Sequence, residues 1–119
     1  MAKIMVKYRK RKRPIKDALQ WAAEAGTYEG AVKQFKETHS WAEYQVVSPE
    51  ERAGEYFVGN ISEIGQQKEE RALKEHKIPY RIGKQAYDIN GRPLSSWHHP
   101  LFIRQSDLKQ YDQMMKNRT

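Results

Sequence analysis

Five consecutive basic residues at positions 9–13 constrain this chain more than any other feature, because such a run cannot be buried without partners. The first sixteen residues carry eight Lys or Arg side chains and no acid. The other 103 residues carry 14 basic and 15 acidic side chains, so the whole excess of positive charge lies at the N-terminus. We therefore expect residues 1–13 to form a basic arm and residues 14–119 to form a single small globular domain.

Basic residues concentrated in this way favour a polyanionic partner, because each phosphate they neutralise releases condensed counterions. We predict nucleic-acid binding, with DNA somewhat favoured over RNA. The residues expected to contact phosphates are Lys7, Arg9, Lys10, Arg11, Lys12, Arg13 and Lys16. An acidic protein cleft, a membrane surface and a merely solubilising tail stay open as alternatives.

The rest of the composition narrows the class of protein. No apolar run approaches the ~20 residues that a membrane-spanning helix needs, and no apolar segment follows the basic start as in a secretory signal. The chain has no cysteine, which excludes disulfides and thiolate zinc sites. We expect a cytoplasmic protein with a modest core, no membrane association, no metal and no cofactor.

Apolar spacing predicts a mainly α fold with one small β-hairpin (α+β). The region 14–76 reads as helical, with Thr27 capping the cleanest segment, and Ser40 and Ser48 each beginning a Ser-x-x-Glu capping box. Asn90-Gly91 is a strong hairpin signal. Ile4, Val6 and Tyr8 alternate with polar residues, which fits either a short edge strand or a disordered arm. The expected segments are helices 15–25, 28–37, 41–47, 49–58, 62–76 and 106–116, and a hairpin over 80–94.

Residues 18–37 can be read as a helix-turn-helix-like unit preceded by the basic arm. Ala22 would lie where the two helices cross and Gly26 in the turn between them. Lys33 and Gln34 would then face outward and contact DNA bases. A second arrangement makes the helix 41–47 the DNA reader, and an ordinary helical hairpin is the competing interpretation.

Two further functions stay open. A protein-binding adaptor or inhibitor of a host nucleic-acid-processing enzyme would place the basic arm in an acidic cleft. A small ribonuclease would use His98, His99 and Arg104. The two histidines make a poor pair, because neighbouring side chains of an extended segment point to opposite sides. Tyr80 and Tyr87 can stack on bases, with packing against the helices as the default. We expect a non-enzymatic accessory factor or regulator of the kind carried by phages or mobile elements.

Overall fold

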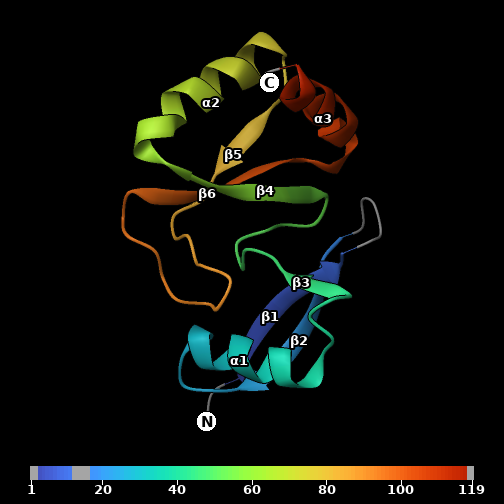
Figure 1. Ribbon diagram of the computed structural model, residues 1–119, viewed down its shortest axis with the longest axis vertical. Helices are drawn as coiled ribbons and strands as arrows, with labels where there is room; N and C mark the ends of the chain where they lie inside the picture. The colour runs from blue at the N-terminus through green and yellow to red at the C-terminus, as the bar shows by residue number, and fades with distance from the viewer. Residues whose placement is uncertain (1–2, 12–16, 118–119) are drawn as a thin grey trace.

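The structure is a computed structural model that describes residues 3–11 and 17–117, and within them the chain forms two antiparallel sheets with three α-helices (Figure 1). The first half of the chain builds a sheet of strand order β2-β1-β3 from β1 (Lys3–Lys10), β2 (Leu19–Glu24) and β3 (Tyr44–Val46), with α1 (Tyr28–Thr38). The second half builds a sheet of order β4-β6-β5 from β4 (Glu55–Ser62), β6 (His98–Arg104) and β5 (Tyr80–Ile82), with α2 (Glu63–Glu75) and α3 (Leu108–Lys116). A short 3₁₀ turn, Gln105–Asp107, precedes α3.

The expected mainly α fold is therefore wrong, and the basic arm is the first place where it fails. Residues 3–10 form the central strand of the first sheet, paired with β2 on one side and β3 on the other. Val6 is fully buried beneath α1, as the alternation of apolar residues allows. The strand also carries basic side chains. The most buried of them, Arg9, forms an ion pair with Glu51.

The helix-turn-helix-like unit is also absent, because its first helix is strand β2. Ala22 and Ala23 fall at helical spacing in the sequence, yet they alternate in the structure, Ala22 exposed and Ala23 buried. The second helix does form as α1, and the Thr27 hydroxyl caps it by accepting the Gly30 N–H at 3.1 Å. What remains is one helix lying on a sheet, without a partner helix to present it to DNA.

The two predicted capping boxes start turns. The Glu43 N–H donates to the Ser40 carbonyl and the Glu51 N–H to the Ser48 carbonyl, each at 3.1 Å, and neither turn continues as a helix. Strand β3 lies within the expected helix 41–47, and β4 overlaps the expected helix 49–58. A Ser-x-x-Glu pattern indicates that a turn forms locally. Whether a helix or a strand follows the turn depends on pairing with residues that are distant in the sequence.

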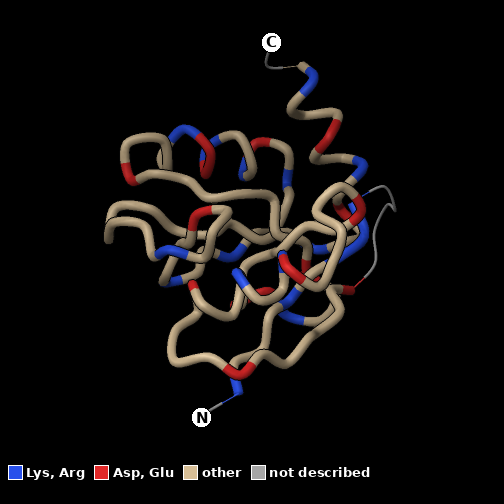
Figure 2. Tube along the Cα trace, turned by 60° about the horizontal axis from the view of Figure 1, so that its bottom comes forward, with Lys and Arg blue, Asp and Glu red and all other residues tan. Residues whose placement is uncertain are grey.

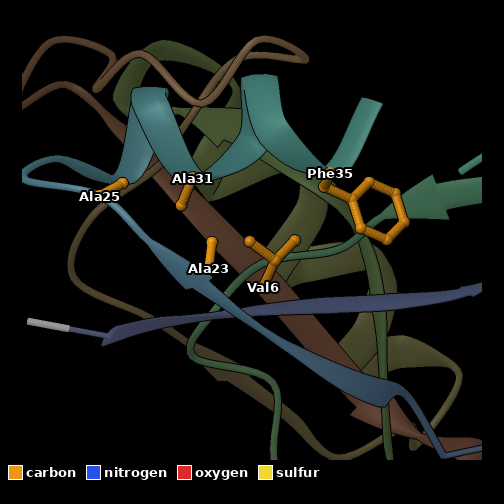
Figure 3. Packing of buried hydrophobic residues seen from close by; sticks show 5 residues of the cluster. All are labelled: Val6, Ala23, Ala25, Ala31 and Phe35. Atoms are coloured by element: carbon orange, nitrogen blue, oxygen red, sulfur yellow. The ribbon is translucent and has the colours of Figure 1, made fainter. Parts of the chain in front are cut away.

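Each half has its own apolar core. In the first, Ala31 and Phe35 point from α1 towards Val6 and Ala23 on the strands (Figure 3). The second core lies between its sheet and the helices α2 and α3, and comprises Leu73, Ile78, Leu101, Ile103 and Met114. In Figure 1 those two helices lie at one end of the molecule and α1 at the other.

The loop between β5 and β6 reaches from the second half to α1. The Lys36 ammonium donates to the Asn90 side chain at 2.5 Å, and Arg92 pairs with Glu29 at 2.8 Å. Gly91 has φ +84°, and a Cβ there would stand 2.7 Å from a Val32 methyl group, so glycine is required. The predicted Asn90-Gly91 turn is thus present, but β5 pairs with β6 and not across this turn. Among the described helices, none is long and apolar enough to cross a membrane.

Candidate functional site

A cleft of about 460 Å³ lies between the two halves of the molecule. We call it the central cleft. One wall is the segment of β3 and the residues after it, and the facing wall is β4 from Tyr56 to Asn60. Residues 87–89 of the β5–β6 loop, Tyr28 at the start of α1 and Trp41 in the segment that follows α1 close it further. The aromatic residues that line it are Tyr28, Trp41, Tyr56, Phe57 and Tyr87, and the polar ones include Arg11, Gln45, Ser48, Asn60 and Asp88.

A β-bulge shapes the wall that β4 contributes. The pairing of β4 with β6 shifts between Phe57 and Gly59, so Val58 is an extra residue on β4. Gly59 adopts φ +137°, a conformation that side chains rarely allow. Bulges of this kind redirect side chains next to binding sites. Here the consecutive residues from Tyr56 to Asn60 all line the cleft, which a regular strand alternating between two faces would not permit.

Most of the aromatic rings of the central cleft are held by a protein neighbour. The rings of Tyr28 and Tyr87 pack with centroids 4.5 Å apart. The Lys36 ammonium lies 4.4 Å from the centre of the Trp41 ring, and the Arg9 guanidinium 4.3 Å from that of Tyr56. These contacts fix the rings before any ligand arrives, which lowers the entropy lost on binding.

The surroundings of two ionisable residues that line the cleft, Tyr28 and Asp88, shift their pKa values. Burial raises the pKa of the Tyr28 phenol, and the neighbouring Tyr87 raises it further. The pKa of Asp88 is lowered chiefly because its carboxylate accepts a hydrogen bond from the backbone N–H of Arg92. A second hydrogen bond, from the backbone N–H of Asn90, lowers it further. Both bonds end on the same carboxylate oxygen, at 2.9 and 2.8 Å.

A buried ion pair stands behind this wall. Arg9 is 4% exposed and Glu51 is 2% exposed, and the guanidinium donates to the carboxylate. The same carboxylate accepts the Phe57 N–H at 2.7 Å, while the Lys7 ammonium donates to the Glu51 carbonyl oxygen. Burial raises the pKa of Glu51, with Arg9 the strongest of the opposing influences. Glu51 therefore joins β1 to β4.

The structure separates the predicted phosphate-binding residues into groups. Lys7 and Arg9 make the contacts with Glu51 just described, and Arg9 has little surface left for a ligand. Lys10 and Arg11 are exposed where β1 ends, and Arg11 lines the central cleft. The expected contacts of Lys12, Arg13 and Lys16 lie outside the described residues.

The two residues predicted to read bases are not part of the cleft lining. Lys33 is exposed on α1, and the Gln34 side chain donates to the Glu24 carbonyl at 2.6 Å. Away from β1, charges of both signs are mixed, as Figure 2 shows along the helix that ends at the C-terminus. The exposed part of the basic segment is thus joined to the cleft through Arg11, and α1 contributes Tyr28 at its start.

The histidines singled out as possible catalysts make separate contacts. His98 Nδ1 lies 2.9 Å from the Ser95 hydroxyl, and His99 Nε2 lies 3.7 Å from a Glu63 carboxylate oxygen. Among residues 3–11 and 17–117, no group of three or more His, Cys, Asp or Glu side chains is placed to hold a metal ion. The chain matches no protein-family model, no curated protein and no solved structure.

Proposed function

We propose that this protein binds nucleic acid and that the basic segment at the end of β1 contacts the phosphates. The observation that carries the proposal is the exposure of Lys10 and Arg11 at the end of β1, with Arg11 also lining the aromatic central cleft. Basic residues at 12, 13 and 16 follow them in the sequence, and the first acid of the chain is Asp17. Proteins that bind single nucleic-acid strands commonly combine a positively charged groove with aromatic side chains on which the bases stack.

The basic residues available for phosphates are fewer than the sequence suggests. With Lys7 and Arg9 held by Glu51, about five remain in the segment, which corresponds to a log–log salt slope of about −3 to −4 on a single strand. These contacts position a strand without reading its sequence. The helical groove reader that the sequence predicted is not part of this proposal.

Reversing the charge at the exit of β1 should weaken binding. The double variant Lys10→Glu/Arg11→Glu is expected to bind a short labelled oligonucleotide at least tenfold more weakly and to show a shallower salt dependence, because two phosphate contacts become repulsive. The matched control is Lys68→Glu/Lys109→Glu, which makes the same change in net charge at exposed positions of α2 and α3. Fluorescence anisotropy over a range of salt concentrations gives both quantities. Equal losses in the two variants would show that only net charge matters.

A protein partner is the second candidate, and a separate surface favours it. Ile64 is 91% exposed and Trp97 is 64% exposed, and the Glu63 N–H bonds the Trp97 carbonyl at 2.8 Å, so the two side chains come from adjoining segments. Exposed Trp is typical of the residues that dominate protein interfaces. An adaptor or inhibitor would use this surface.

For that second candidate, proteins purified with the parent after nuclease treatment should be lost with Trp97→Ala and retained with Lys33→Ala, a change at an exposed position of α1. Quantitative mass spectrometry of the purified material provides the comparison. Partners that disappear entirely on nuclease treatment would speak against an adaptor.

A further inference from the structure

We infer that the central cleft receives one unpaired base of a single-stranded nucleic acid. The inference rests on the proposed function and narrows it from nucleic acid in general to strands with accessible bases. Two observations support it. The cleft is lined by aromatic residues, and Arg11 belongs both to the basic segment and to that lining.

The cleft has the size and chemistry that a flat polar ring requires. Its volume of about 460 Å³ lies within the range of about 300–1,000 Å³ typical of small-molecule sites. Trp41, Tyr56 and Tyr87 supply ring surface for stacking, and Gln45 and Asn60 supply amide groups for the edge of a base. The amide of Asn60 also donates to the Tyr87 carbonyl at 3.0 Å, which fixes the side chain beside that ring.

The electrostatics of the cleft suit a nucleotide rather than a free apolar ligand. Arg11 places a positive charge at the lining, next to exposed Lys10. The phenol of Tyr28 is uncharged at neutral pH, as is that of any tyrosine whose pKa is not lowered, so it does not repel a phosphate. Asp88 is the acidic residue of the described lining, and one of its carboxylate oxygens already accepts two backbone N–H groups.

A duplex does not meet these requirements. Its bases are stacked and paired, and a base must leave the stack before side chains can surround it, which costs a few kcal/mol. The central cleft is bounded on both sides by protein, by β3 and its following segment and by β4. A single strand presents its bases without that cost, so it should bind more tightly than a duplex of the same length and charge density.

The test compares strands that carry the same phosphates with and without bases. We expect the wild-type protein to bind oligothymidylate or oligouridylate about tenfold more tightly than an abasic deoxyribose-phosphate strand of equal length, since stacking on an aromatic side chain contributes a factor of roughly five to over a hundred per base. A blunt duplex should bind more weakly than oligothymidylate. The comparison of the thymidine and uridine strands shows whether DNA or RNA is preferred.

A matched pair of variants assigns the effect to the cleft. Trp41→Leu removes a ring of the lining, and Trp97→Leu makes the same change on the exposed surface outside it. The preference for oligothymidylate over the abasic strand should fall to about twofold or less in the first variant and stay near tenfold in the second, with the affinity for the abasic strand unchanged in both. Circular dichroism verifies that each variant is folded.

A measurement on the unmodified protein makes the test independent of folding in Trp41→Leu. Ultraviolet crosslinking to oligothymidylate, followed by peptide mass spectrometry, should place crosslinks on Trp41, Tyr56 or Tyr87. Equal affinity for base-bearing and abasic strands, tighter binding of the duplex, or crosslinks confined to other residues would overturn the cleft inference and leave nucleic-acid binding in place. Failure to bind any of these strands would overturn the proposed function itself.

Discussion

Replacing Phe35 with alanine should lower the free energy of unfolding by about 3–5 kcal/mol, the usual effect of deleting a buried phenyl ring. Phe35 is fully buried in the first core (Figure 3). Its ring lies 4.9 Å from that of Tyr8 and stacks on His39 at 4.1 Å. It thereby joins α1 to the central strand β1. Because small domains are stable by only about 5–15 kcal/mol in total, this single change should leave the first half barely folded.

Urea unfolding followed by circular dichroism measures this loss. Lys33→Ala is the control, since it also changes a residue of α1 but at an exposed position, and it should alter stability by less than about 0.5 kcal/mol. If Phe35→Ala unfolds at nearly the same urea concentration as the parent, α1 does not bury this face against the sheet, and the arrangement of the first half described above is incorrect.

The second large effect should come from Arg9→Met. The variant leaves the carboxylate of Glu51 buried without its cationic partner, and breaking a buried ion pair on one side typically costs about 3–5 kcal/mol. In the double variant Arg9→Met/Glu51→Gln neither side chain is charged, and the Gln oxygen can still accept the Phe57 N–H. We expect the double variant to recover most of the stability that Arg9→Met loses.

The loss in Arg9→Met should also depend on pH. Burial already raises the pKa of Glu51 in the native protein, and without Arg9 the strongest opposing influence is removed, so the pKa rises further. A carboxyl group with a raised native pKa binds its proton more tightly when folded, so stability is lost as pH rises from the unfolded pKa towards the folded one. Arg9→Met should therefore be least destabilised at about pH 4 and more so at about pH 7. A loss that is independent of pH would mean that Glu51 is solvated.

The elements that the sequence predicts correctly are those with local signals. Thr27 and Ser62 each accept the N–H of the glycine three residues later, and α1 and α2 begin immediately after them. The turn at Asn90-Gly91 follows from the conformation that glycine permits. Each of these signals is contained within a few neighbouring residues.

The segments 4–8 and 80–82 were considered as strands, and the other strands were missed because their partners are distant. Tyr8 pairs with Val46, and the charge of Arg9 is neutralised by Glu51, 42 positions away. Without these partners the run of basic residues reads as an unfolded arm, and the alanines of β2 read as a helix. Strand pairing is specified by the fit of faces across the sheet rather than by intrinsic preference, which a single segment does not reveal.

The candidate site was anticipated in part. Exposed Lys10 and Arg11 came from the charge run, and Tyr87 was considered as a base-stacking residue. The role of Tyr28 and Tyr56 in the lining had no signal in the sequence, because one belongs to α1 and the other to a bulged strand whose register depends on β6. By contrast, Tyr80, the other tyrosine considered for stacking, donates its hydroxyl to Glu70 at 2.7 Å.

The walls of the central cleft come from both halves of the chain, and this links occupancy of the cleft to global stability. A molecule seated there touches α1, the β5–β6 loop and β4 together, and these surfaces meet only in the folded state. By mass action, a ligand present at a hundred times its dissociation constant adds about 2.7 kcal/mol to the stability of the folded form. Thermal shift screening thus reports a cleft ligand as an increase in the melting temperature of the whole protein, without a label or a known substrate.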